Sequence, residues 1–379
     1  MQIELPISKS IANRWLILQA IHGDEPAGSP TALASWGALM PVSADLPEDV
    51  KILRNALTTL RTFKTSKTLS TPHIDVGNCG TAMRFLTAYC AQLEGQTTIL
   101  DGVERMHHRP IGQLVDALRE IGADIEYLGE EGFPPLRIKG CILDKHRIVT
   151  INNPQSTQFV SALLLIGANV QTDSTSPYIT LTREMIKNKE QGTKNKDKLL
   201  TTNQTQVTNL GSLLLAPYSE IERDWSSAAF WYEYVALHGG EITLPGLSRD
   251  SLQGDKVVAD IFAHLGVLTT HTAEGVVISS SPLHSTPFTL HHDFSACPDL
   301  YPAVALTCER LGITLHATGV ESLPIKESDR LRAVREHRTD ADHRMAMALL
   351  IAGYEVDNTA CISKSYPQFL EHFRQLRKK

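Results

Sequence analysis

The stretch GNCGTAMRFLTAYCAQLEG, residues 77–95, has the composition of one complete buried helix with its two ends. Turn-forming residues that can cap a helix precede an apolar run, and a glycine suited to a left-handed cap follows it. Arg84 sits near the start, where free N–H groups make the helix end positive and unfavourable for a cation. A strong anion beside this turn would make the arginine favourable there. The stretch therefore predicts a buried helix that begins at an anion site.

The same pattern of a polar cap, small residues and an apolar run occurs six times. The six stretches are SKSIANRWLILQAIHG from Ser8, NCGTAMRFLTAYCAQLEG from Asn78, NPQSTQFVSALLLIGA from Asn153, RDWSSAAFWYEYVALHGG from Arg223, ACPDLYPAVALTCERLG from Ala296 and DADHRMAMALLIAGYEV from Asp340. Comparable first-turn positions are 71, 75, 70, 72 and 45 residues apart. Four similar intervals indicate an internal repeat, and the last repeat is short.

Strand-like and amphipathic stretches lie between these six. We expect strands in TTILDGV, RIVTINN, YITLTRE, EITLPG, GVVISSS and ITLHATGV, which are rich in β-branched residues or alternate in polarity. We expect surface helices in RPIGQLVDALREIGA and GDKVVADIFAHLGV, which are amphipathic and end at glycine. Repeated strand and helix units place the chain in the α/β class.

Composition excludes several classes of protein. With 42% hydrophobic and 21% charged residues in 379, the chain is globular and long enough for two domains. Its net charge of −6 disfavours nucleic acid or an acidic membrane as partner. The start MQIELPISKS does not resemble a signal peptide, and no apolar run reaches membrane-spanning length. The six scattered cysteines suit a reducing compartment, so we expect a cytoplasmic protein.

The stretch PIKESDRLRAV, residues 324–334, concentrates charges of both signs. If it is helical after Pro324, Lys326 and Arg330 share one face, with Glu327 near the same cavity. Two donors for anionic oxygens would then flank a carboxylate able to move protons. Such a run is more often a solvated helix face, and only its combination with other motifs favours the site.

That combination resembles the 5-enolpyruvylshikimate-3-phosphate synthase family of enolpyruvyl transferases. The resemblance runs from Leu5 to about Phe373 and is carried, in order, by LPISKSIANR, GNCGTAMRFL, HRPIGQLVDALREIGA, STQFVSALLL, DWSSAAF, CPDLYPA, the KESDR motif, DHRMAMAL and SKSYPQF.

The resemblance implies a two-domain fold. Each domain is expected to contain three β-α-β-α-β-β units around buried helices whose N-termini face the cleft between domains. One domain would span residues 7–222, and the other would combine residues 1–6 with 223–379. We expect a monomer that requires no metal or organic cofactor.

The resemblance also implies a reaction and its site. The enolpyruvyl group of phosphoenolpyruvate would move to the 5-hydroxyl of shikimate 3-phosphate, with release of phosphate. Phosphoenolpyruvate would contact Lys9, Gly80, Arg109, Gln158, Arg330, Arg344 and Lys364. Shikimate 3-phosphate would contact Lys9, Ser10, Arg14, Ser156, Thr157, Gln158, Tyr178, Asp299, Ser322 and Lys326.

The chemistry requires one acid-base group near C3 of the enol and another near the attacking hydroxyl. We assign Glu327, with Lys9, to C3 and Asp299 to the hydroxyl as catalytic hypotheses. Two alternatives are a sister enzyme that adds enolpyruvyl to a UDP-sugar and a catalytically inactive relative that only binds anions. The sister lacks the KESDR motif and carries Lys-Asn where this chain has Lys9-Ser10. Retention of the charged site residues disfavours the inactive relative.

The sequence departs from the family in its last interval. Only twelve positions separate Arg330 from Asp342, far fewer than in the family, so a strand pair and part of a helix are missing. Either this unit is trimmed, or residues are absent from the sequence, and the joined look of REHRTDADHR favours the second. The lysine-rich residues 187–198 lack aromatic side chains, so we expect a solvated loop there and no nucleic-acid site.

Overall fold

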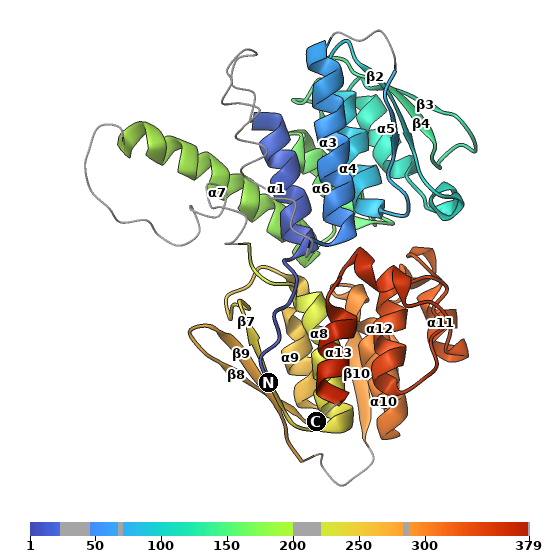
Figure 1. Cartoon of the computed structure of the whole chain (residues 1–379). Helices are drawn as coiled ribbons and strands as arrows, with labels where there is room; N and C mark the ends of the chain where they lie inside the picture. The colour runs from blue at the N-terminus through green and yellow to red at the C-terminus, as the bar shows by residue number, and fades with distance from the viewer. Residues whose placement is uncertain (23–45, 67–70, 200–220, 283–287, 378–379) are drawn as a thin grey trace. The chain divides into compact units, whose positions relative to one another are not determined.

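A computed structural model describes residues 1–22, 46–66, 71–199, 221–282 and 288–377. The chain forms two compact units (Figure 1). Unit 1 comprises Met1–Lys9, Ala44–Glu48 and Glu222–Lys379, and unit 2 comprises Ser10–Ser43 and Asp49–Ile221. The Ala-, Ser- and Pro-rich segment after Gly23 and the polar segment 201–209 lie outside the described residues.

Unit 2 contains one complete repeat in the order β-α-β-α-β-β. It consists of β1 (His73–Asp75), α4 (Gly80–Ala91), β2 (Thr97–Asp101), α5 (Gly112–Glu120), β3 (Asp124–Tyr127) and β4 (Leu136–Lys139), with the 3-10 turn η1 (Glu104–His108) after β2. The sheet order is β1-β2-β4-β3. β1 and β2 are parallel, and β4 is antiparallel to both β2 and β3.

The other elements of unit 2 belong to two further repeats. They are α1 (Lys9–His22), α3 (Glu48–Ser66), β5 (Ile148–Thr150), α6 (Thr157–Leu165), β6 (Asn169–Gln171) and α7 (Pro177–Leu199). β5 and β6 pair in parallel, as β1 and β2 do. The crossover helix between parallel strands is thus used twice in this unit.

Unit 1 repeats the topology, with N-terminal residues beside its first strand. Its elements are α8 (Trp225–His238), β7 (Glu241–Pro245), η3 (Gly254–Val257), α9 (Val258–Ala263), β8 (Val267–His271) and β9 (Gly275–Ser280), and the sheet order is β7-β9-β8. Gln2 forms a parallel bridge to Thr243 of β7, on the edge that β1 occupies beside β2. Two sheets from distant parts of the sequence therefore share one plan.

The next repeat of unit 1 is short. Its elements are β10 (Thr289–Asp293), η4 (Pro298–Leu300), α10 (Tyr301–Leu311), β11 (Thr314–Thr318), η5 (Leu323–Ile325) and α11 (Arg330–Glu336), followed by α12 (His343–Ala352), η6 (Ala360–Lys364) and α13 (Phe369–Arg377). β10 and β11 pair in parallel, and no strand follows α11 before α12.

The link between α11 and α12 comprises only the six residues 337–342. His337, Asp340 and Ala341 within this link all adopt positive φ angles of 45–58°. Such angles are unfavourable for residues with a Cβ, so the chain turns tightly in this link.

All six predicted inner helices are confirmed as α1, α4, α6, α8, α10 and α12. Ser156, Asp224 and Asp342 cap α6, α8 and α12 through side-chain oxygens. Cys79 caps α4 through its sulfur. Side-chain caps satisfy first-turn N–H groups that would otherwise lack partners in a buried helix.

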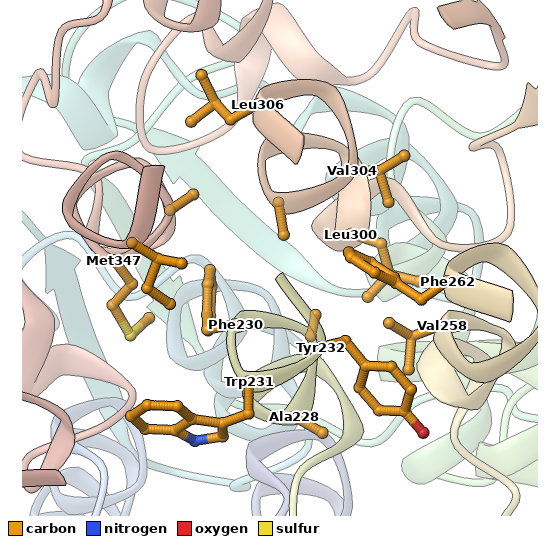
Figure 2. Packing of buried hydrophobic residues seen from close by; sticks show 14 of the residues in the cluster. Ala228, Phe230, Trp231, Tyr232, Val258, Phe262, Leu300, Val304, Leu306 and Met347 are labelled. Atoms are coloured by element: carbon orange, nitrogen blue, oxygen red, sulfur yellow. The ribbon is translucent and has the colours of Figure 1, made fainter. Parts of the chain in front are cut away.

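Helix α8 lies at the centre of the unit 1 core. Figure 2 shows its Phe230, Trp231 and Tyr232 surrounded by Val258 and Phe262 of α9, Leu300 of η4, Val304 and Leu306 of α10, and Met347 of α12. Trp231 is fully buried, and its indole N–H donates to the Tyr366 hydroxyl at 3.1 Å. The pairing removes the penalty of burying two polar groups.

The segment YITLTRE, residues 178–184, is helical, so the strand predicted there is wrong. It belongs to α7, which continues to Leu199 and also replaces the loop expected at residues 187–198. Ser176 accepts from the N–H of Tyr178, and Pro177 occupies the first helical position, where proline is favoured. These start signals outweigh the β-branched composition that suggested a strand.

The chain passes between the units beside a short backbone pairing. Ile7 and Arg223 form an antiparallel bridge, and the N–H of Ser8 donates to the carbonyl of Glu222 at 2.9 Å. Residues 7–9 and Glu222 therefore fall in unit 1, whereas the predicted division at residues 6/7 and 222/223 placed them in the other domain.

Candidate active site

Asp299 is the centre of a charged cluster in unit 1. Its carboxylate accepts from Arg330 Nη1 and from Arg344 Nη2, each at 2.7 Å, and Lys326 Nζ lies 3.7 Å away. All three cations and the carboxylate were predicted to bind substrates. Arg330 and Arg344 are almost completely buried, whereas Asp299 is partly exposed. The cluster therefore consists of a partly accessible carboxylate whose two arginine partners are buried.

Three helix starts place these groups together. Asp299 lies in η4, directly before α10. Asp329 caps α11 and Asp342 caps α12, which fixes Arg330 and Arg344 in the first turns of these helices. Cations at helix N-termini oppose the helix dipole, and nearby carboxylates offset that repulsion.

Residues 326–330 do not form a helical turn, so the condition for Lys326 and Arg330 to share one helix face is not met. Lys326 has an extended backbone, and α11 begins only at Arg330 because Asp329 accepts from the N–H of Arg332. Lys326 and Arg330 nevertheless reach the same carboxylate, through a bend instead of one helix face.

Arg330 holds three carboxylates at once. Besides Asp299, it donates from Nη2 to Glu327 at 3.1 Å and from Nε to Asp342 at 2.8 Å. Glu327 also accepts from Lys364 Nζ at 3.0 Å. A guanidinium can serve several acceptors in fixed directions because its five N–H groups are planar. Glu327 is therefore held between two predicted phosphoenolpyruvate ligands.

The cluster shifts the pKa values of its members. Burial alone would raise the pKa of Asp299, but Arg344, Lys326 and Arg330 hold it well below its usual range. Burial lowers the pKa of Arg330, yet Asp342, Asp299 and Glu327 together raise it. Both groups are charged, as a paired buried cluster requires.

Lys9 and His343 lie in the same unit. The N–H of Lys9 donates to Asp224 Oδ2 at 3.3 Å, which joins the start of α1 to the cap of α8. His343 is buried, and burial followed by the charges of Lys9, Arg344 and Lys364 holds its pKa well below the usual value. A neutral imidazole therefore lies among the cations.

Unit 2 contains a second cationic cluster at the start of α4. A Cβ added at Gly80 would lie 2.3 Å from Arg84 Nη1 and 2.6 Å from Arg109 Nη2, so these two atoms are within about 5 Å of each other. At that distance two unit charges repel by about 3 kcal/mol for an effective dielectric constant of about 20. Both side chains are nearly buried. The start of α4 therefore brings two buried cations close together.

Arg109 and Arg84 are positioned by backbone carbonyls. Arg109 Nη1 donates to the carbonyl of Asn78 at 3.2 Å, and Arg84 Nη2 donates to the carbonyl of Pro110 at 3.1 Å. Both of these acceptors are neutral backbone carbonyls, which orient the two donor nitrogens. Arg109 has no ion-pair partner within the described ranges.

Helix α6 contributes hydroxyl and amide groups to unit 2. Ser156 caps the helix by accepting from the N–H of Gln158, and Thr157 is its first residue. Gln158 Nε2 donates to Thr81 Oγ1 of α4 at 2.8 Å. The hydrogen bond joins the first turns of two helices, which is a favourable environment for an anionic ligand.

Arg14, a predicted site residue, is held by hydrogen bonds to other parts of unit 2. It is buried and donates to the Ser10 carbonyl, Thr182 Oγ1, Ser161 Oγ and the Tyr178 carbonyl at 2.7–3.2 Å. Burial lowers its pKa to about 10. With four of its five N–H groups engaged, Arg14 mainly fixes Ser10 and Tyr178 in place.

The remaining predicted residue, Ser322, precedes η5 in unit 1 and makes no hydrogen bond with the cluster among the described residues. Sequence reasoning missed three buried groups that lie beside the cluster, namely Asp255, Asp342 and His343. Asp255 is buried, bonded to Ser226, and burial with the charge of Asp299 raises its pKa to about 6. The helix-capping pattern DADHR could have identified Asp342, whereas Asp255 has no comparable signal.

Two features are absent from the described residues. No group of three His, Cys, Asp or Glu side chains that could hold a metal ion is present in the described ranges. Among the helices that the structure describes, none is long and apolar enough to cross a bilayer.

Comparison with known structures supports the fold assignment. Two EPSP synthase structures from Acinetobacter baumannii align with TM-scores of 0.61 and 0.57. They are 19% and 18% identical in sequence, and each alignment covers 99% of this chain and 95% of the other. The expected two-domain enolpyruvyl transferase fold is confirmed.

Curated relatives match along nearly the whole chain. A 3-phosphoshikimate 1-carboxyvinyltransferase of Bacteroides fragilis is 34% identical, with 98% of this chain and 94% of the relative covered. One of Colwellia psychrerythraea is 29% identical, with 99% and 96% covered. The Bacteroides alignment spans 419 positions, more than the 379 residues of this chain, so the relative has residues that this chain lacks.

The family model described as EPSP synthase (3-phosphoshikimate 1-carboxyvinyltransferase) matches residues 1–337 and 334–373. The match is divided at the short link between α11 and α12. Because the two matches together cover nearly all of the sequence, the chain belongs to the EPSP synthase family.

Proposed function

We propose that this chain transfers the enolpyruvyl group of phosphoenolpyruvate to the 5-hydroxyl of shikimate 3-phosphate and releases phosphate, in aromatic amino acid biosynthesis. Family membership supports this activity. The observation that carries it at the site is the binding of Asp299 by Lys326, Arg330 and Arg344. A cluster of cations of this kind supports the binding of multiply anionic substrates.

Phosphoenolpyruvate is the proposed ligand of cations from both clusters. Arg330, Arg344, Lys364 and Lys9 from unit 1 would act with Arg109, Gln158 and the backbone of Gly80 from unit 2. The crowding of Arg109 and Arg84 around Gly80 supports an anion at that helix start. Arginine forks suit carboxylate and phosphate groups because they donate two parallel hydrogen bonds.

Shikimate 3-phosphate is the proposed ligand of the hydroxyl-rich part of unit 2. The proposed contacts are Lys9, Ser10, Arg14, Ser156, Thr157, Gln158, Tyr178, Asp299, Ser322 and Lys326. The capped start of α6 supports a phosphate there, since helix N-termini bind phosphate through free N–H groups. Arg14 supports the site mainly by holding Ser10 and Tyr178.

Asp299 is proposed as the base for the 5-hydroxyl. In the described arrangement its pKa is too low for an efficient base, because three cations stabilise the carboxylate. Anionic substrates would form ion pairs with these cations and so weaken the stabilisation of the Asp299 carboxylate. The pKa of Asp299 would then rise toward its ordinary value, so that substrate binding itself would activate the base.

Glu327, with Lys9, is proposed to act at C3 of phosphoenolpyruvate. The C3 carbon gains a proton as the hydroxyl attacks C2, and the tetrahedral adduct then loses phosphate and a C3 proton. Arg330 and Lys364 fix the Glu327 carboxyl from two sides, which supports a group held in one position. A positioned acid-base group contributes about 10²–10⁴-fold to rate.

A phosphate-release assay tests this function against its two alternatives. We expect release that requires both phosphoenolpyruvate and shikimate 3-phosphate. Release with phosphoenolpyruvate and UDP-N-acetylglucosamine would indicate the sister activity. Absence of release with either acceptor, although both ligands bind, would indicate an anion-binding relative and overturn the proposal.

We also propose that the protein acts in the cytoplasm. All six cysteines are free thiols, four of them buried. Free structural cysteines are typical of proteins that work in a reducing compartment.

A further inference from the structure

β11 has no neighbouring strand on its outer edge, whereas the corresponding strands of two other repeats each have one. β2 is covered by the antiparallel β4, and β7 is covered by the antiparallel β9. β11 follows the same β-α-β crossover as β2 but pairs only with β10. The strand pair that would cover it is missing from the short link between α11 and α12.

The side chains of β11 also show that it lacks a neighbour. The inward residues of β2 and β7, such as Leu100 and Leu244, are fully buried. The equivalent residues of β11, Leu315 and Ala317, are only half-buried, while its other three residues are exposed. A strand that would be interior in a complete repeat is therefore left at an edge.

The backbone register identifies which groups face outward. The carbonyl of Thr318 accepts from the N–H of Phe294, so Thr318 faces the β10 side. N–H and C=O groups alternate in direction along a strand, which turns those of Leu315 and Ala317 to the open side. Across residues 314–318, all of which are described, no backbone partner is found on that side.

The open edge lacks the usual protection against strand pairing. Natural edge strands are often blocked by lysine, proline or a bulge. The sequence Thr-Leu-His-Ala-Thr of β11 contains no charged residue other than a titratable histidine, no proline and no glycine. Its two threonines are β-branched residues that favour extended backbone.

We propose that β11 pairs antiparallel with β11 of a second copy of this chain. A twofold axis through His316 would place Leu315 opposite Ala317 of the partner and Thr314 opposite Thr318. Leu315 and Ala317 are the two residues whose backbone groups face outward, so they form the hydrogen-bonded pairs of an antiparallel ladder. The near-palindromic sequence favours an identical strand over an unrelated peptide. The joined sheet would have the order β10-β11-β11-β10.

The pairing forms a small interface, so the dimer is expected to be weak and concentration-dependent. It also departs from the monomer that the family resemblance implied. That expectation assumes a complete repeat, in which β11 is covered within its own chain.

Replacing His316 by Cys tests the register directly. His316 would face its own copy in a non-hydrogen-bonded pair with Cα atoms about 4.5 Å apart, a distance that a disulfide can bridge. His291, which stacks on His316 from β10 with ring centroids 4.9 Å apart, is the matched control. Two His291 residues would lie about 14 Å apart across three strand spacings. We expect a covalent dimer under mild oxidation with His316→Cys, and none with His291→Cys or the unsubstituted protein.

Ala317→Pro provides a second test that does not depend on cysteine chemistry. Proline removes the outward N–H, and edge strands tolerate it where that N–H faces away from the sheet. Ala317→Val keeps the N–H and is the control. By light scattering, the unsubstituted protein and Ala317→Val should rise above 41.8 kDa with concentration, while Ala317→Pro should not. A mass of 41.8 kDa for the unsubstituted protein at every concentration, or crosslinking equal at positions 291 and 316, would overturn the proposal.

Discussion

Arg330 and Asp342 are both completely enclosed, and Nε of Arg330 donates to Oδ2 of Asp342 at 2.8 Å. Asp342 also caps α12 by accepting from the N–H of Arg344. One carboxylate thus fixes two arginines at the starts of two helices. The remaining N–H groups of Arg330 are thereby directed to Asp299 and Glu327.

Replacing Arg330 by Lys should damage substrate recognition severely. A single ammonium cannot donate in the three directions that Asp342, Asp299 and Glu327 require. Each lost hydrogen bond to a charged group is worth about 1.5–3 kcal/mol, or about 10–100-fold in kcat/KM. The matched control is Arg332→Lys two residues later, on an exposed side chain. Equal kcat/KM values for the two variants would contradict the role of Arg330.

Replacing Glu327 by Gln should reduce turnover more than binding. The amide keeps the shape but cannot shuttle the C3 proton, so kcat should fall about 10²–10⁴-fold. The Kd for phosphoenolpyruvate, measured by calorimetry in the presence of shikimate 3-phosphate, should change much less. Near-normal kcat would remove Glu327 from the acid-base role.

Replacing Gly80 by Ala should weaken phosphoenolpyruvate binding. The new Cβ would lie 2.3 Å from Arg84 Nη1 and 2.6 Å from Arg109 Nη2, so both guanidinium groups must move. We expect KM for phosphoenolpyruvate to rise about 10- to 100-fold, since shifts near 1 Å have effects of this size.

Gly112→Ala is the control for this substitution. Gly112 is also the first residue of a helix, and a Cβ there makes only ordinary contact at 3.5 Å. A comparable rise in KM for both variants would mean that the effect does not come from the arginines.

Replacing Glu233 by Met should stabilise the protein at alkaline pH. Glu233 is fully buried in α8, neither of its carboxyl oxygens has a hydrogen-bond partner among the described residues, and burial raises its pKa well above 4.5. The folded state therefore keeps a proton that the unfolded state releases. Its contribution is favourable below pH 4.5 and is lost as the pH rises toward the raised folded pKa.

The variant should thus gain stability relative to the unsubstituted protein as pH increases above 4.5. The gain should approach about 1.4 kcal/mol per pH unit within this window. Urea unfolding at a series of pH values measures it. A difference in unfolding free energy that does not change with pH would contradict a buried protonated carboxyl.

Local sequence rules predicted most elements. They failed where a helix-capping residue indicates a helix but the amino-acid composition indicates a strand. The six inner helices were predictable because each joins a capping residue to an uncharged run, as in Asp224 before α8. Residues 178–184 were misassigned since β-branched residues masked the start signal at Ser176 and Pro177. Asp329 likewise delayed the start of α11 beyond Lys326.

The site was partly predictable for a different reason. The charges of Asp299, Glu327 and Arg330 are visible in the motifs, but which carboxylate each cation contacts depends on helices distant in sequence. Asp255 and Glu233 were not predicted because a buried carboxyl has no local sequence signature. The open edge of β11 became visible only when the sheets were compared.

Product analysis in D₂O tests the central claim that this site carries out addition and elimination on its two substrates. The protein, incubated with phosphoenolpyruvate and shikimate 3-phosphate, should form 5-enolpyruvylshikimate 3-phosphate with deuterium at the vinyl C3, because C3 is protonated from the site before it loses a proton. Mass spectrometry detects both the product and its label. Absence of the product, or product without any deuterium at C3, would contradict the account.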